Sequence, residues 1–295
     1  MLLNASGCLD ALAAPDVARS LDAFVTKTVT PEPRQGNEPT RIAETDHGML
    51  NSIGLQNPGR ERFLADVLPR LREQGVPLWV SAGGFSAQDY AETCEALHDV
   101  TIELNLSCPN VDEAPETAAE IVTACRAATP LPLYAKLSPA LSDVAEVARA
   151  VQAAGADGLS LVNTIRGLGL DPRTLRPRLA RAVGGYSGPA LKPIALAAIY
   201  AAYRATGLPI VGMGGVWTGR DALDFIAAGA SAIALGTVLF TDPGAPVRIR
   251  QELYEQAASL GFAEPFEARG LAHEPDTQAL ASNLTTEKTP AFQSN

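Results

Sequence analysis

Short β-rich runs alternate with helical patterns along most of this chain of 295 residues. In the segments between the runs, apolar residues recur with a period near 3.6, as in 114–128, 141–153, 190–205 and 218–228. The β-rich runs are 2–6, 23–29, 77–82, 101–107, 131–137, 157–163, 208–213 and 232–240. Eight such alternations predict a (β/α)8 TIM barrel, and a doubly wound parallel sheet is the alternative architecture.

Two connections are too long to be plain turns between a strand and its helix. Residues 30–58 and 164–189 are rich in proline and glycine, and long ordered insertions after barrel strands usually form lids or walls. We therefore expect a barrel over residues 1–262 with inserted strand-end loops. Residues 263–295 form a C-terminal extension, which we expect to be disordered from about residue 273 because it becomes polar and loses its periodicity.

Charge and hydropathy argue against several classes of function. The net charge is −10 and no run of Lys or Arg occurs, so we expect no nucleic-acid partner. No apolar stretch reaches the roughly 18 residues that a membrane-spanning helix needs. The first residues also lack the basic region of a signal peptide. These features predict a cytoplasmic protein without a membrane partner.

The cysteines and histidines are scattered rather than clustered. The four cysteines and three histidines show no metal-ligand spacing, so we expect no metal site and reduced thiols. Cys94 and Cys125 fall inside helical patterns and are expected to be buried as small apolar side chains.

One cysteine stands apart from the others because of its neighbours. Residues 103–110 end a β-rich run on Cys108, which lies between Asn105 and Asn110. Pro109 prevents a helix from starting at once, so the thiol is expected on a loop at the carboxyl end of the strand. A thiol among amide side chains indicates a reactive group that faces a polar, planar ligand.

Other predicted strands also end in residues suited to binding. Lys27 and Lys136 lie in apolar, β-rich contexts, where an ammonium group must pair with an anion or reach solvent. Gly214 and Thr237 follow the last two strands, where barrels bind phosphate through backbone N–H groups. No acidic residue lies at these strand ends to bind a metal. Each feature alone has an ordinary explanation, such as a solvated lysine or a tight turn, but together they favour a flat, phosphorylated cofactor.

With these residues assembled, the chain resembles dihydroorotate dehydrogenase, an FMN flavoprotein with a (β/α)8 barrel. The matching motifs are 26–34, 51–59, 105–110, 136–139, 162–164, 184–190, 212–215 and 236–237, which lie in family order between about residues 4 and 250. The cysteine at 108 resembles the soluble class 1 of the family, because the membrane-associated class carries serine at this position. The segment 54–59 looks most like the NAD-linked branch, class 1B.

The resemblance implies a reaction and a role for each matching residue. Cys108 would be the base that takes a proton from C5 of (S)-dihydroorotate, while hydride passes from C6 to N5 of FMN and orotate forms for pyrimidine biosynthesis. The residues implied to bind the substrate are Lys27, Asn51, Ser52, Ile53, Gly54, Leu55, Asn105, Asn110, Asn163 and Thr164. Those implied to bind FMN are Ser6, Lys27, Thr28, Asn105, Lys136, Val162, Gly188, Gly214, Gly215, Gly236 and Thr237.

The resemblance also implies partners. The chain has no cysteine cluster for an iron–sulfur centre and no Gly-x-Gly-x-x-Gly after a strand, so electrons would reach NAD through a partner subunit carrying FAD and a 2Fe–2S cluster. A homodimer is expected.

An alternative to this function is a flavin-bound homologue with an altered pyrimidine substrate, or one without activity that serves as a binding or scaffold subunit.

Three departures from the family pattern bear on these alternatives. The chain begins at its first strand, apparently without the N-terminal hairpin of the family. Ser81 stands where the family usually has an asparagine near the flavin, and the segment after Cys108 is shorter than usual.

Overall fold

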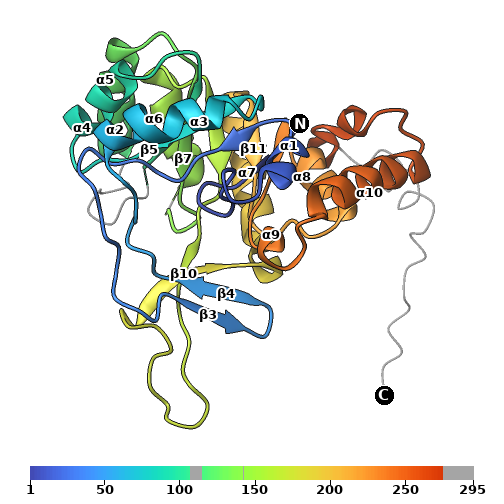
Figure 1. Cartoon of the computed structure of the whole chain (residues 1–295). Helices are drawn as coiled ribbons and strands as arrows, with labels where there is room; N and C mark the ends of the chain where they lie inside the picture. The colour runs from blue at the N-terminus through green and yellow to red at the C-terminus, as the bar shows by residue number, and fades with distance from the viewer. Residues whose placement is uncertain (107–114, 142, 275–295) are drawn as a thin grey trace, which may run out of the picture.

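Eight parallel strands form a nearly closed barrel in the computed structural model, which describes residues 1–106, 115–141 and 143–274 (Figure 1). The strands are hydrogen-bonded in the order β1-β12-β11-β8-β7-β6-β5-β2. A parallel bridge between Leu3 and Ala23 joins the two ends of this order. The barrel strands are β1 (Leu2–Asn4), β2 (Phe24–Val25), β5 (Leu78–Ala82), β6 (Thr101–Asn105), β7 (Leu133–Leu137), β8 (Gly158–Leu161), β11 (Ile210–Gly212) and β12 (Ala232–Leu235). The predicted barrel is confirmed, and the doubly wound alternative is wrong.

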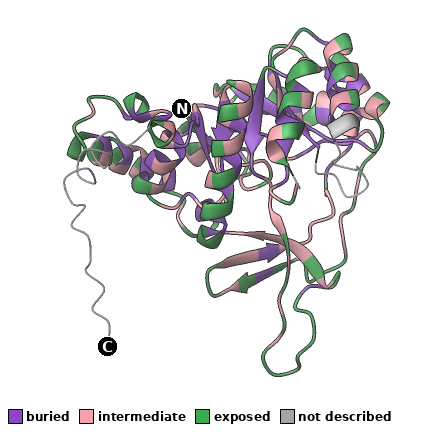
Figure 2. Cartoon of the chain, turned by 180° about the vertical axis from the view of Figure 1, so that it is seen from behind, coloured by how far each residue is buried: buried purple, intermediate pink, exposed green. Residues whose placement is uncertain are grey.

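Helices surround the barrel and cover its outer face (Figures 1 and 2). The α-helices are α1 (Pro15–Arg19), α2 (Arg60–Arg62), α3 (Leu68–Arg72), α4 (Ala87–Glu95), α5 (Pro115–Ala128), α6 (Val144–Ala153), α7 (Lys192–Thr206), α8 (Gly219–Ala227), α9 (Val238–Thr241) and α10 (Ala245–Ser259). A π-helical turn, Phe63–Val67, joins α2 to α3, and 3-10 turns occupy Pro189–Leu191, Pro265–Ala268 and Leu271–His273. No helix in the described ranges is long and apolar enough to cross a membrane.

Side-chain caps fix where several of these helices begin. Ser86 and Asp89 form a reciprocal capping box at the start of α4, and Thr218 and Asp221 form another at the start of α8. Asp143 caps α6 by accepting a hydrogen bond from the N–H of Glu146. These caps, together with the apolar faces of the helices, explain why the segments with a period near 3.6 form helices.

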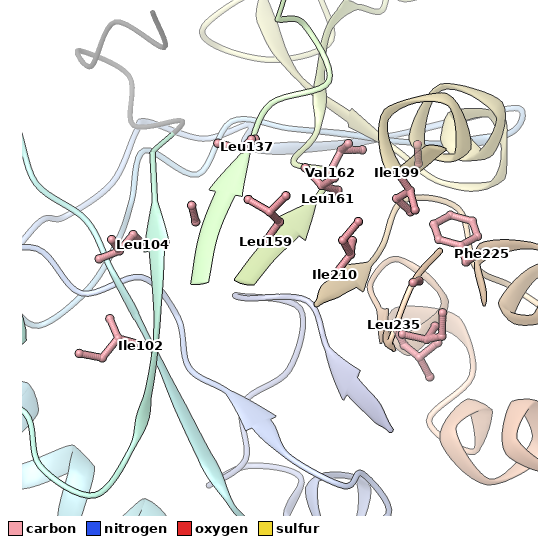
Figure 3. Close-up of a cluster of buried hydrophobic side chains, with 14 of the residues drawn as sticks. Ile102, Leu104, Leu137, Leu159, Leu161, Val162, Ile199, Ile210, Phe225 and Leu235 are labelled. Atoms are coloured by element: carbon pink, nitrogen blue, oxygen red, sulfur yellow. The ribbon is translucent and has the colours of Figure 1, made fainter. Parts of the chain in front are cut away.

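The main core lies between the strands and the helices. Figure 3 shows Ile102, Leu104, Leu159 and other strand residues pointing to this layer, with Ile199 and Phe225 contributed by helices. Cys94 and Cys125 are fully buried in it, as predicted. Because successive side chains of a strand point to opposite faces, the alternate residues of the same strands face the barrel interior. A smaller apolar cluster, including Leu3, Val25, Trp79 and Val211, fills part of that interior.

The two long insertions form a second sheet, which the sequence did not predict. Residues from both insertions pair antiparallel in the order β3-β4-β10-β9 and extend away from the barrel (Figure 1). The strands are β3 (Ile42–Thr45), β4 (Gly48–Asn51), β9 (Ile165–Leu168) and β10 (Val183–Ser187). Ala43, Leu50 and Leu179 form its own small core, with Tyr186 packed against them. The insertions expected as lids or walls therefore form an ordered sheet, whose strands the sequence did not predict.

The prediction of a strand over 232–240 is wrong beyond Leu235. The strand ends there, and after Gly236 and Thr237 the chain turns into α9. Val238 and Leu239 are apolar, which fits a strand or a core position in the sequence, but in the structure both are buried as part of a helix. Tertiary packing therefore overrides their local preference.

The C-terminal extension begins as ordered structure. Ala268 is buried within Pro265–Ala268, and the ring Nε2 of His273 lies 2.9 Å from the backbone oxygen of Ala228. The predicted disorder beyond about residue 273 concerns residues 275–295, which lie outside the described residues.

Asn4 completes the barrel where β1 meets β2. The backbone N–H of Val25 donates to Oδ1 of Asn4 at 2.8 Å, and Nδ2 of Asn4 donates to the backbone oxygen of Val25 at 2.8 Å. Asn4 is fully buried, so its amide replaces the pair of hydrogen bonds that a longer strand would supply.

Replacing Asn4 by alanine is predicted to lower the free energy of unfolding by about 1–3 kcal/mol, because two buried backbone groups lose their partners. Urea denaturation measures this change. Gln152→Ala is the matched control, since the exposed Gln152 amide also donates to a backbone oxygen, that of Thr206 at 2.9 Å. Its expected cost is within about 0.5 kcal/mol. Equal losses in the two variants would contradict a special role for Asn4.

Candidate active site

A cavity of about 540 Å³ lies where the carboxyl ends of the barrel strands face the antiparallel sheet. The predicted site residues that line it are Ser6, Lys27, Thr28, Asn51, Ser52, Ile53, Gly54, Leu55, Asn105, Lys136, Val162, Asn163, Thr164, Gly188, Gly214, Gly215, Gly236 and Thr237. Cys108 and Asn110 lie outside the described residues. The fold thus gathers residues from distant parts of the chain around one cavity.

A chain of hydrogen bonds crosses the mouth of the barrel. Nδ2 of Asn105 donates to Oγ1 of Thr28 at 3.2 Å, and Oγ1 of Thr28 lies 3.0 Å from Oγ of Ser81. On the other side, Nδ2 of Asn163 donates to Oδ1 of Asn105 at 3.2 Å. The hydroxyl of Tyr90 donates to the backbone oxygen of Asn105 at 2.7 Å. The orientation of the Asn105 amide is therefore set from both sides before any ligand binds.

Two lysines bring positive charge to the cavity wall. Lys136 is 5 % exposed, and its Nζ lies 3.3 Å from Oε1 of Glu103, which is 1 % exposed. The side chain of Lys27 passes over Gly7, where a Cβ atom would lie 3.1 Å from its Nζ. Glu103 is the anion that we expect beside a buried lysine, although Glu103 does not itself line the cavity.

Cys8 also lines the cavity, close to these charges. Burial raises the pKa of the Cys8 thiol above its ordinary value, while Lys136 and Lys27 act in the opposite direction and Glu103 adds a smaller increase. The thiol is therefore a neutral, weakly polar part of the wall at neutral pH.

The antiparallel sheet and the first insertion supply the opposite wall. Nδ2 of Asn51 donates to the backbone oxygen of Gly185 at 3.3 Å. Gly185 must be a glycine, because a Cβ atom there would lie 2.1 Å from Oγ1 of Thr164. Asn37 donates to Oγ of Ser52 at 2.9 Å and fixes the loop that carries it.

Two polar residues of this wall, Asn37 and Gln56, were missed by sequence reasoning. Gln56 accepts a hydrogen bond from Arg41 at 2.8 Å. Both lie inside the first long insertion, and their amide side chains near the predicted substrate residues were the signal that could have found them.

A group of glycines forms one end of the cavity. Gly214 and Gly215 have φ angles of +114° and +96°, which favour glycine, and a Cβ atom on Gly215 would lie 2.8 Å from the backbone nitrogen of Lys192. Within the described residues, the backbone N–H groups of Gly214, Gly215, Gly236 and Thr237 find no acceptor. Unpaired N–H groups on a cavity wall suit a bound anion such as a phosphate.

The lysine beside this glycine group is already paired. Nζ of Lys192 lies 2.6 Å from Asp221 and 2.7 Å from Asp224. Burial raises the pKa of Asp221, but hydrogen bonds from Lys192 and Thr218 outweigh it and hold the pKa below its ordinary value. Lys192 therefore ties α7 to α8, and the glycine group offers an anion mainly backbone N–H groups.

Comparisons with known proteins point to one family. The sequence profile of the dihydroorotate dehydrogenase family matches residues 1–256. The catalytic subunit of dihydroorotate dehydrogenase B (NAD+) from Listeria welshimeri is 43 % identical over 254 residues, which cover 82 % of this chain and 84 % of that protein. The corresponding subunit from Desulforudis audaxviator is 43 % identical over 264 residues, with 86 % of each chain covered.

Solved structures give the same fold. Ligand-free DHODH from Eimeria tenella matches with a TM-score of 0.79 and 25 % identity, covering 92 % of this chain and 89 % of that one. The complex of DHODH from Eimeria tenella with ferulenol matches with a TM-score of 0.78 and 24 % identity, covering 93 % and 85 %.

Proposed function

Because the chain belongs to the dihydroorotate dehydrogenase family, we propose that it is the catalytic subunit of an NAD-linked dihydroorotate dehydrogenase. It would oxidise (S)-dihydroorotate to orotate in pyrimidine biosynthesis. The observation that carries this proposal is that two lysine ammonium groups, four asparagine amides and a cluster of backbone N–H groups without an acceptor in the described residues line the same cavity.

The residues of the cavity fit FMN. FMN would supply the two-electron acceptor for the reaction. Lys136 and Thr28 would lie beside its ring, with Ser6, Lys27, Asn105 and Val162 completing that part of the wall. The unpaired N–H groups of Gly214, Gly215, Gly236 and Thr237, together with Gly188, would hold its phosphate. Because a Cβ atom on Gly215 meets backbone atoms, this end of the cavity keeps its shape only with glycine.

The opposite wall fits a pyrimidine with a carboxylate. A dihydroorotate ring offers both N–H donors and carbonyl acceptors, and the amides of Asn51, Asn105 and Asn163 supply both kinds of partner. The fixed amide of Asn105 orients the ring, and Lys27 would pair with the carboxylate. Ser52, Ile53, Gly54, Leu55 and Thr164, with Asn110, would complete the substrate site.

Cys108 would remove the proton from C5 of the substrate. The thiolate is the active form, and a free thiol with a pKa near 8.5 is only a few per cent ionised at neutral pH. The rate of the chemical step is therefore coupled to the titration of this thiol. In the sequence Cys108 lies between Asn105 and Asn110, three residues after Asn105, the last residue of β6.

Anaerobic mixing of the FMN-loaded protein with dihydroorotate is predicted to bleach the flavin absorbance, at a rate that rises with pH through the titration of Cys108. Stopped-flow absorbance measures this rate. Cys108→Ala is expected to slow bleaching by about 10²–10⁴-fold, the usual contribution of a general base. Cys125→Ala, which removes a thiol buried on α5, is the matched control and should bleach like the wild type.

A stable yellow spectrum after mixing would rule out dihydroorotate as the substrate and favour a homologue with another pyrimidine substrate or a scaffold role. A bleaching rate that does not depend on pH would contradict Cys108 as the base. Colourless protein that cannot be reconstituted with FMN would rule out every flavin-dependent function.

We also propose that a partner subunit carrying FAD and a 2Fe–2S cluster takes the electrons to NAD, and that the catalytic chain is a cytoplasmic homodimer. The names of the relatives, which are catalytic subunits of NAD-linked enzymes, support the existence of this partner.

The isolated FMN-loaded chain is predicted not to reduce NAD with dihydroorotate, whereas addition of the partner should allow NADH to form. The absorbance of the reduced nicotinamide at about 340 nm measures this reaction. NADH formation by the isolated chain at the same rate would contradict the need for a partner.

A further inference from the structure

Glu103 is a buried carboxylate that the proposed reaction does not use. It lies in the middle of β6, two residues before Asn105, and is 1 % exposed. Its Oε1 is 3.3 Å from Nζ of Lys136, and within the described residues neither side chain forms a second ion pair. Lys136 lines the cavity, whereas Glu103 lies behind it.

An ion pair in this position is costly. Removing two charges from water usually costs more than their mutual attraction returns, and apolar residues of similar size often serve stability better. The barrel interior offers such residues elsewhere, as in the cluster of Leu3, Val25 and Val211. Stability alone therefore does not explain why a carboxylate stands behind the ammonium group of the cavity.

The field of Glu103 reaches the cavity wall. Cys8 lines the cavity, and the influence of Glu103 on its thiol opposes that of Lys136 and Lys27. Within the described residues, Lys136, Lys27 and Glu103 are the charged groups that act on Cys8, so charges of both signs lie close to this wall. A ligand placed against Lys136 therefore experiences the combined electrostatic field of these groups rather than the charge of Lys136 alone.

We propose that Glu103 is a positioning residue that holds Lys136 at the cavity wall and, through its negative charge, lowers the reduction potential of the bound flavin. This inference rests on the proposed function. A lysine beside the flavin favours its electron-rich reduced form, and a buried carboxylate behind that lysine offsets the effect. NAD is a weak oxidant, so an enzyme that passes electrons to it requires a flavin that gives them up readily.

The test is the midpoint potential of FMN-loaded Glu103→Gln, measured by equilibration with a redox dye in the absence of dihydroorotate and NAD. Glutamine keeps the size of the side chain and an oxygen that accepts from Lys136 but removes the charge. The equilibrium is expected to shift at least about tenfold toward the reduced flavin, which for two electrons raises the potential by about 30 mV.

Two matched variants separate charge from packing. Glu103→Asp shortens the side chain but keeps the charge, and it should shift the equilibrium by much less than Glu103→Gln. Ser160 lies opposite Lys136 in the neighbouring strand, and its buried hydroxyl has no hydrogen-bond partner among the described residues, so Ser160→Ala should leave the potential unchanged. An unchanged or lowered potential in Glu103→Gln would overturn the proposal, as would an equal shift in Glu103→Asp.

A second comparison applies if Glu103→Gln does not fold with FMN. Lys136→Arg is then compared with the double variant Glu103→Gln/Lys136→Arg, because the guanidinium stays charged and can keep Glu103 in an ion pair. The double variant should have the higher potential, by about tenfold in the equilibrium, and equal potentials would overturn the proposal.

The outcome is separable from that of the proposed function. If the wild-type protein holds FMN but dihydroorotate does not bleach it, the proposed function fails while the dye measurement still decides the role of Glu103. If the wild-type protein does not bind FMN, both proposals are overturned.

Discussion

The ammonium group of Lys136 is buried at the mouth of the barrel, and its pairing with Glu103 is the constraint around which the site is arranged. A charge in this position needs an anion within reach, since an isolated buried ion is very unfavourable. The barrel provides it because β6 and β7 are neighbours, with Glu103 and Asn105 on the same face of β6. Within the described residues, the other polar side chains of the cavity apart from Lys27 are neutral. A site with this distribution can hold an anionic, planar ligand while a second polar ring is recognised by hydrogen bonds.

Parallel pairing carries this arrangement from strand to strand. Asn105 lies opposite Lys136, and Lys136 lies opposite Ser160, so three polar side chains stand side by side on neighbouring strands. The hydrogen bonds from Asn105 to Thr28 and from Asn163 to Asn105 then join strands that are far apart in sequence. Pre-oriented amides lose little conformational freedom when a ligand binds, which favours both affinity and the correct placement of the ring.

The eight barrel strands and the residues at their ends could be predicted because hydrophobic periodicity is local and the geometry of a parallel barrel is regular. The antiparallel sheet could not, since Asn51 of β4 pairs with Gly185 of β10 from the other insertion, and no local pattern specifies so distant a pairing. Glu103 was missed for a different reason. It lies inside a strand rather than at its end, so a survey of strand ends found no acidic residue. The strand predicted over 232–240 ends at Leu235, and Val238 and Leu239 are instead buried as part of the helix α9.

We propose that one cavity holds FMN against Lys136 and dihydroorotate against the asparagine amides, and a crystal structure of the protein with FMN and orotate would reveal where both ligands bind. We expect the flavin ring within hydrogen-bond distance of Nζ of Lys136, about 3 Å. We also expect the phosphate on the N–H groups of Gly215 and Thr237, with orotate between Asn51 and Asn163. A flavin bound elsewhere, or orotate bound without contact to these amides, would contradict this arrangement.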